Sequence, residues 1–374
     1  MALTRRKTFL IWHRWFGLLA GFWLLLMAIT GAIIVFYDEL DRALNPDLLL
    51  VKTPASAINV ASVQAAVEAA HPDRFLWLID YPNTHQESGL AQMRPRPNTQ
   101  SEGTLSVYFD SASNALLGER RVDEQGFNRR HILHLIYELH IDLMLGQTMM
   151  WLLGLVALLW LLDHIAAFAL SFPNPAKWRR SFVLRWRAGD YKRLFDIHRA
   201  SGLWLYPVTL VLAFSGLYFN WYSPMTSAIN WFSPLQSRAV FELPALDQPN
   251  FAPALNYTSA EKALRVEIGN APIDKVMYFA HKGVYEFRLF DPRDIDPYGR
   301  RYVVVNATHG GVQSDWHITE GNFGNQLIAW QYPLHSGKAF GWPGRLLIFG
   351  SGLMIVLLAV SGLLIWLRKR RAKA

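Results

Sequence analysis

The chain has 374 residues, of which 52% are hydrophobic, and it carries a formal net charge of +8. This apolar content is too high for an ordinary soluble enzyme, and the lack of cysteine excludes disulfides, iron–sulfur clusters, thiolate zinc sites and covalently attached c-type haem. The positive charge lies in short clusters beside apolar runs, which argues against a nucleic-acid partner and indicates a membrane protein in contact with lipid.

Four apolar runs are long enough to cross a bilayer, which takes roughly 20 residues. They cover approximately residues 9–36, 143–172, 202–221 and 346–367. Backbone polar groups in lipid must be satisfied within their own segment, so we expect each run to be a helix. Pro207 lies inside the third run and predicts a kink there.

The basic clusters predict the topology. They lie at residues 5–7, at 177–193 between the second and third runs, and at 368–373. All three fall on one side of a four-span arrangement, as the positive-inside rule requires. We therefore expect a multi-pass protein of the bacterial inner membrane with both termini in the cytoplasm. The first run is longer than the apolar core of a signal peptide and predicts a retained anchor.

The two halves of the chain repeat one plan. In each outer segment a short amphipathic helix (residues 61–70 and 258–264) precedes segments that alternate as strands do (104–110 in the first; 275–280, 284–289 and 301–306 in the second). The predicted fold is an α-helical integral membrane protein with four main transmembrane helices in two parallel in-out-in repeats, and two small α+β units in the periplasm. The expected domains are span one (1–37), outer unit one (38–140), span two (141–172), a basic loop (173–197), span three (198–222), outer unit two (223–343) and span four with its basic tail (344–374).

Four histidines follow two shared rules. His13 and His198 each begin an apolar run with glycine four residues later, while His140 and His335 each precede a glycine by six residues. Orientation places the first pair near the cytoplasmic face and the second near the outer face. Each pair can offer two imidazoles from different helices to one planar macrocycle, which predicts a haem at each pair. Ligation by two histidines leaves no open iron position, an arrangement suited to electron transfer.

Other residues compete for these roles. His164, beside Asp163 in the second run, is an ionisable residue within a span and could replace His13 or His198 as a ligand. His134 is an alternate ligand near the outer face. Arg345 could neutralise a haem propionate or contact a lipid phosphate. The His-Arg and Ser/Thr-Gly pairs could also be ordinary interfacial and helix-packing residues.

Several aromatic residues of the outer segments could stack on or hydrogen-bond a metal chelate bound outside the membrane, although aromatic packing is the more common role of each. They are Tyr278, Tyr285, Tyr298, Tyr302, Trp316, Trp330 and Tyr332.

The motifs together resemble those of a known family. They are His13-Arg-Trp-Phe-Gly-Leu, the Leu-His-Ile-Asp-Leu-Met-Leu-Gly of 139–146, the Ile-His-Arg-Ala-Ser-Gly-Leu-Trp of 197–204, the Leu-His-Ser-Gly of 334–337, and the span ends Thr30-Gly31, Ser215-Gly216 and Ser361-Gly362. This set resembles the PepSY-associated transmembrane family, and within it the inner-membrane ferric-siderophore reductases of the FoxB type. The resemblance implies haem b at His13, His140, His198 and His335, periplasmic iron reduction and a part in iron uptake. His164 stands where a glycine-containing span end is expected, which is a departure.

The resulting hypothesis is an oxidoreductase with no catalytic residues beyond its haems. Electrons would enter at the cytoplasmic side, pass from the haem of His13 and His198 to that of His140 and His335, and reduce a ferric siderophore. No G-x-G-x-x-G follows a strand and the cytoplasmic loop is short, so membrane quinol or a separate cytoplasmic reductase would be the donor. The alternatives are a non-catalytic PepSY module that regulates a protease or transporter, and a histidine-gated transporter.

Overall fold

The computed structural model describes residues 3–51, 58–82, 84, 86–172 and 174–372, and these form two compact units. The helical unit comprises Met1–Tyr37, His134–Trp231 and Trp330–Ala374, and the sheet unit comprises Asp38–Leu133 and Phe232–Ala329. The expected chain ends at residues 1 and 374, and residue 173 at the start of the expected basic loop, lie outside the described residues.

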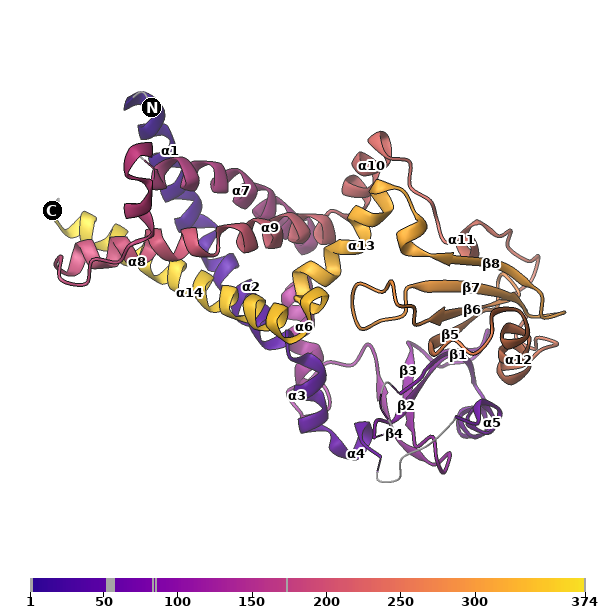
Figure 1. The fold of residues 1–374 in the computed structure, drawn as a ribbon. Helices are drawn as coiled ribbons and strands as arrows, with labels where there is room; N and C mark the ends of the chain where they lie inside the picture. Colours follow the sequence, from indigo (N-terminus) through magenta and orange to yellow (C-terminus); the bar gives the residue numbers. More distant parts are fainter. Residues whose placement is uncertain (1–2, 52–57, 83, 85, 173, 373–374) are drawn as a thin grey trace. The chain divides into compact units, whose positions relative to one another are not determined.

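Helices account for nearly all of the helical unit (Figure 1). In chain order its elements are α1 (Leu3–Leu19), α2 (Gly21–Ile34), α6 (Ile132–Ile141), α7 (Gln147–Ser171), η1 (Pro175–Phe182), α8 (Asp190–Trp204), α9 (Tyr206–Asn220), α10 (Tyr222–Phe232), α13 (Phe323–Ser336), η3 (Lys338–Phe340) and α14 (Gly341–Arg371), of which α6, α10 and α13 extend into the sheet unit. Within the unit α2 packs on α14, and α7 packs on both α9 and α1.

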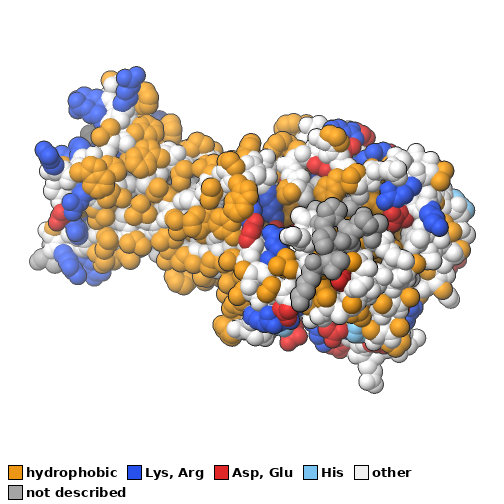
Figure 2. All heavy atoms as spheres, turned by 60° about the horizontal axis from the view of Figure 1, so that its bottom comes forward, with side chains coloured by type: hydrophobic (Ala, Val, Ile, Leu, Met, Phe, Trp, Pro, Cys, Tyr) orange, Lys and Arg blue, Asp and Glu red, His pale blue; other side chains and the backbone are white. Residues whose placement is uncertain are grey.

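Two helices of the described chain are long and apolar enough to cross a membrane by themselves. They are α7 and the stretch Lys338–Arg371, which contains α14. Two bent pairs raise the number to four if each pair is one span: α1 with α2, bent by 56°, and α8 with α9, bent by 66°. Hydrophobic side chains cover the surface of these helices, and Lys and Arg gather at the end that carries both termini (Figure 2). The chain therefore has the helices of a membrane protein.

The first apolar run is not the single helix that we expected. It breaks at Ala20, between Gly17 and Gly21, where the missing side chains allow the axis to bend. The predicted kink in the third run is confirmed, because α9 restarts with Pro207 in its first turn. Since α1 begins at Leu3 and α8 at Asp190, His13 and His198 lie inside helices rather than at their beginnings.

The second span also begins later than predicted. Leu143 and Met144 adopt left-handed φ values of 55° and 60°, and Gly146 follows with a φ of 69°. These conformations are incompatible with a continuous right-handed helix. The helix α7 therefore starts at Gln147.

The sheet unit contains one antiparallel sheet of eight strands in the order β4-β3-β2-β1-β5-β6-β7-β8. The strands are β1 (Arg74–Asp80), β2 (Gly89–Pro95), β3 (Leu105–Phe109), β4 (Leu116–Arg121), β5 (Ile273–Phe279), β6 (Val284–Leu289), β7 (Arg301–Asn306) and β8 (Val312–His317). The expectation of two separate α+β units is therefore wrong in one respect: β1 pairs with β5, so the two outer segments share a sheet. This pairing removes an exposed edge from each half.

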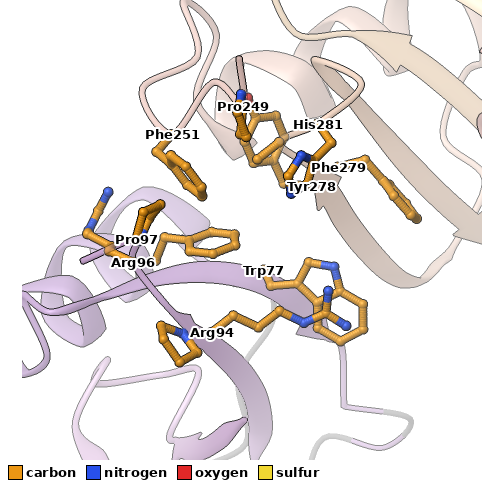
Figure 3. Close-up of a pocket in the computed structure, with 12 residues that line it drawn as sticks. Trp77, Arg94, Arg96, Pro97, Pro249, Phe251, Tyr278, Phe279 and His281 are labelled. Atoms are coloured by element: carbon orange, nitrogen blue, oxygen red, sulfur yellow. The ribbon is translucent and has the colours of Figure 1, made fainter. Parts of the chain in front are cut away.

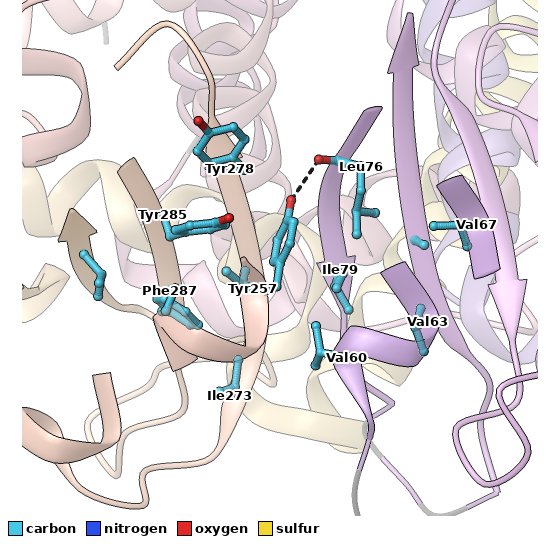
Figure 4. Close-up of a cluster of buried hydrophobic side chains, with 14 of the residues drawn as sticks. Val60, Val63, Val67, Leu76, Ile79, Tyr257, Ile273, Tyr278, Tyr285 and Phe287 are labelled. Carbon is cyan, nitrogen blue, oxygen red and sulfur yellow. Dashed lines mark hydrogen bonds between the residues drawn. The ribbon is translucent and has the colours of Figure 1, made fainter. Parts of the chain in front are cut away.

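Two helices contribute to the core of this sheet, one from each outer segment (Figure 4). They are α5 (Val60–Ala70) and α12 (Tyr257–Ile268), whose predicted counterparts at 61–70 and 258–264 are confirmed. Tyr257 of α12 is buried and donates a hydrogen bond of 3.0 Å to the carbonyl of Leu76 on β1. Its ring also meets that of Tyr285 at 4.9 Å. The remaining elements are α3 (Tyr37–Leu44), α4 (Pro46–Leu49), α11 (Ala239–Glu242) and η2 (Ile318–Glu320).

Because Tyr257 ties the two outer segments together, its hydroxyl can be tested separately from its ring. Tyr257→Phe should lower the free energy of unfolding by about 1 kcal/mol through the lost hydrogen bond, whereas Tyr257→Ala should cost about 3–5 kcal/mol through the cavity it leaves. Hydrogen exchange of β1 and β5 in the full chain would measure both. Equal effects of the two variants would contradict this account.

Candidate functional site

The structure brings His13 of α1 and His198 of α8 next to each other. Their ring centroids lie 6.0 Å apart, with an angle of 63° between the ring planes. His13 Nδ1 lies 2.9–3.0 Å from both carboxylate oxygens of Asp163 on α7. His198 Nδ1 lies 2.9 Å from the hydroxyl of Ser361 on α14. Four helices thus build this pair, which we call the His13–His198 pair.

His140 and His335 form a second pair with nearly the same geometry. Their centroids are 6.2 Å apart and their planes differ by 59°. His140 Nδ1 is 3.0 Å from the hydroxyl of Thr30 on α2, and His335 Nδ1 is 2.7 Å from the hydroxyl of Ser215 on α9. The structure therefore pairs the histidines in the combination that the two sequence rules predict.

The hydroxyl partners fix the proton on each ring. Thr30 donates its hydroxyl proton to the carbonyl of Leu26, Ser215 donates to that of Val211, and Ser361 donates to that of Leu357. A hydroxyl that gives its one proton to a carbonyl of its own helix can only accept from the histidine, and in that arrangement the hydrogen lies on Nδ1. A carboxylate can only accept, so Asp163 imposes the same tautomer on His13. All four rings then present the lone pair of Nε2, as ligating histidines with an oriented Nδ1–H do.

Each of the three hydroxyl residues is followed by a glycine. At two of the three positions, the missing side chain makes room for a histidine ring. A Cβ atom added to Gly31 would lie 2.9 Å from Cε1 of His140, and one added to Gly362 would lie 3.2 Å from Cε1 of His198. At Gly216 the nearest atom would be Cβ of Ala157, at 3.9 Å. The Ser/Thr-Gly pairs therefore do more than pack helices: sequence reasoning noted them but missed their hydroxyls as partners of the histidines.

Asp163-His164 takes the position of the fourth Ser/Thr-Gly pair. Asp163 contacts His13 as the hydroxyls contact the other three histidines. The ring of His164 instead places Nδ1 2.8 Å from the carbonyl of Trp160 and Nε2 3.1 Å from the hydroxyl of Thr209. Both of its nitrogens have protein partners, so the structure does not bring His164 into the His13–His198 pair.

The other alternates also lie among protein partners. His134 Nε2 is 3.7 Å from a carboxylate oxygen of Glu138, and its ring stacks on Tyr137. Arg345 is buried and donates two hydrogen bonds, of 2.8 and 3.2 Å, to the carbonyl of Val35. Its guanidinium also lies 4.7 Å from the ring centroid of Trp342. A propionate partner at Arg345 stays a prediction.

The aromatic candidates of the outer segments mostly serve the sheet. Tyr278, Tyr285 and Tyr302 are buried, and Trp316 stacks on Tyr302 across neighbouring strands. Burial raises the pKa of Tyr278 to about 12 and that of Tyr285 still further. Aromatic packing, the alternative considered from the sequence, therefore accounts for these residues.

The donor set of each pair fits haem. Ring centroids 6.0 and 6.2 Å apart are compatible with one metal between the two imidazoles of a pair, since a metal–imidazole bond is about 2 Å long. The described residues offer no cluster of three or more His, Asp or Glu side chains that could hold a metal ion. Two imidazoles match in number and type the two protein ligands that a haem iron takes in a site with two histidines.

The contact between Gly31 and His140 predicts a size limit at this position. Gly31→Ala should push the ring of His140 aside and lower stability by about 1–3 kcal/mol, as overpacking does. Gly350→Ala in α14 is the matched control, because a Cβ atom there would meet nothing within 4 Å. The thermal midpoints of the two purified variants provide the measurement. A midpoint for Gly31→Ala at or above that of the control would contradict the size limit.

Comparison with known proteins agrees with these observations. No protein with curated annotation matches the chain. The family model of the PepSY-associated TM region matches residues 10–369, which include all four paired histidines and nearly the whole chain. The chain is therefore a membrane protein of the PepSY-associated transmembrane family.

Proposed function

We propose that the protein is a haem-b reductase of the bacterial inner membrane that passes electrons outward to ferric siderophores. The observation that carries the proposal is the arrangement of four histidines in two facing pairs, each ring with its Nδ1–H directed to an acceptor. Haem b, held through Nε2 of both rings of a pair, would supply one-electron redox chemistry.

The acceptor at Nδ1 would set the basicity of each histidine as a ligand. Thr30, Ser215 and Ser361 hold their histidines with neutral oxygens, whereas Asp163 holds His13 with a carboxylate. An acceptor on the far nitrogen orients the ring and raises its basicity as a ligand, and a carboxylate does so most strongly. If each pair holds one haem through both of its histidines, the protein would supply two iron ligands per site, and the group would serve electron transfer rather than oxygen binding.

The same two bent helix pairs connect the two histidine pairs. His13 and Thr30 are 17 residues apart on α1 and α2, and His198 and Ser215 are also 17 residues apart on α8 and α9. Along a straight helix this spacing corresponds to about 26 Å. The bends of 56° and 66° shorten it, which favours electron transfer between the pairs.

The direction of transfer follows from the basic residues. Arg179 and Arg180 of η1 and the last turn of α14, Arg368–Arg371, would face the cytoplasm under the positive-inside rule, as would both termini. This orientation puts the His13–His198 pair at the cytoplasmic face, where quinol or a separate reductase would donate. The His140–His335 pair would then serve a ferric siderophore outside. Hard oxygen chelators hold ferrous iron less well than ferric iron, so reduction would release it.

The first test is a dithionite-reduced minus oxidised visible spectrum of the detergent-purified protein, with haem quantified per chain. We expect sharp low-spin b-type bands and about two haems per chain, because each pair offers two imidazoles to one iron. His198→Ala and His335→Ala should each lose one haem. His309→Ala, on an exposed turn of the sheet unit, should keep both.

A colourless protein that also takes up no added haem would contradict the proposal. It would leave the non-catalytic PepSY module or the histidine-gated transporter, for which substitution of the paired histidines would not change a visible spectrum. If two haems are present, reduction of a ferric siderophore by the reduced protein is the next assay.

The carboxylate at His13 predicts that the two haems differ in reduction potential. Asp163→Asn keeps an acceptor for the Nδ1–H but removes the charge that stabilises ferric iron, so one of the two midpoint potentials should rise. Thr30→Ser is the control, because it keeps the hydroxyl at His140 and should shift neither potential. Spectroelectrochemical titration measures both midpoints. Unchanged potentials in Asp163→Asn would show that the carboxylate does not tune the site.

A further inference from the structure

A pocket of about 390 Å³ lies on the sheet unit, where the two outer segments meet. Its floor and walls come from β1, the end of β2, the end of β5 and the loop before α12 (Figure 3). A volume of this size is within the range of small-molecule sites. Neither the paired histidines nor the aromatic candidates of the sequence, apart from Tyr278, belong to it.

The charges lining the pocket are of one sign. Arg94 of β2 lies over the indole of Trp77, with 3.5 Å between its guanidinium carbon and the ring centroid. Arg96 also lines the pocket, and its Nε donates a hydrogen bond to the carbonyl of Arg74. The described lining includes no Asp or Glu, and no carboxylate of the described chain pairs with Arg94. An anion in the pocket would therefore meet the guanidinium of Arg94, with Arg96 nearby, and no carboxylate of the described lining.

Aromatic rings make up the opposite wall, and the fold holds them in place. Phe75 of β1 packs edge-on against Phe251, with 4.9 Å between the centroids. Two hydrogen bonds hold the loop that carries Phe251. The hydroxyl of Tyr278 donates to the carbonyl of Asn250 at 2.6 Å, and the backbone N–H of Asn250 donates to the carbonyl of Ala280. Figure 3 shows Phe251 and Tyr278 on one side of the pocket and Trp77 and Arg94 on the other. The wall is thus assembled from both halves of the sheet.

We propose that this pocket binds an anionic ligand with planar aromatic groups, of the class of ferric tris-catecholate chelates. A catecholate ring can stack on the Trp77–Arg94 pair or on Phe251, while its oxygens and the net negative charge of the chelate face Arg94 and Arg96. A tris-hydroxamate chelate lacks the aromatic ring and the excess negative charge, so it would gain neither interaction. The choice of an iron chelate within this ligand class rests on the proposed function.

The test uses gallium(III) chelates, because gallium matches ferric iron in charge and size but is not reduced under these conditions. Calorimetric titration of the full chain in detergent would compare the trianionic gallium tris-catecholate with an uncharged gallium tris-hydroxamate. We expect binding of the catecholate only, and weaker binding as ionic strength rises. Arg94→Gln and Trp77→Leu should each raise the Kd about fivefold or more, which is the effect of losing one charge contact or one stacking contact.

Two further variants make the result specific. Arg94→Lys keeps the charge but not the planar stack and should bind with intermediate affinity. Arg121→Gln removes an exposed arginine of β4 that pairs with Asp123 outside the pocket, and should bind as the unaltered protein does. Equal Kd values for Arg94→Gln, Trp77→Leu and Arg121→Gln would overturn the proposal, as would equal binding of both chelates.

The visible spectrum of the same samples separates this proposal from the proposed function. Two haems without catecholate binding would overturn the pocket assignment alone. Catecholate binding that depends on Arg94 in a protein without haem would support the pocket and contradict the reductase.

Discussion

The hydrogen bond from each histidine Nδ1–H to an acceptor on a neighbouring helix is the interaction on which the helical unit depends. Inside a membrane an imidazole with an unsatisfied N–H is costly, so each ring requires an acceptor, and the acceptor fixes both tautomer and orientation. Thr30, Ser215 and Ser361 meet this need after donating their own protons within their helices. The bond therefore links helices from different parts of the chain and leaves Nε2 available at the same time.

The four histidines each have an acceptor at Nδ1, but the acceptors differ in charge. Three acceptors are hydroxyls and the fourth is the carboxylate of Asp163. A repeated fold would by itself make the two histidines of each pair equivalent, because His13 corresponds to His198 and His140 to His335. The single carboxylate breaks that equivalence at His13. His164 follows as a consequence, since it occupies the glycine position beside Asp163 and turns towards Trp160 and Thr209.

The sheet unit combines the halves of the chain in a different way. The two outer segments each provide four strands and one helix of the core, and the pairing of β1 with β5 makes one sheet of the strands. The core gains continuity across the junction through Tyr257, which reaches from α12 to the carbonyl of Leu76. The junction also brings Trp77 and Arg94 of one segment near Phe251 of the other, so a pocket exists that neither segment contains alone.

Local rules were enough to predict much of this protein from its sequence. Apolar length identified the membrane helices, Pro207 identified a bend, period-two alternation identified β5, β6 and β7, and the spacing of His13, His140, His198 and His335 identified the pairs. Only the tertiary structure decided the bend at Ala20, the union of the two outer segments, the acceptors of the histidines and the pocket at Trp77. The last three of these depend on residues that lie far apart in the chain, such as His13 and Asp163. Helical and strand periodicity register only neighbours within a few residues, so they carry no information about which distant side chains will meet.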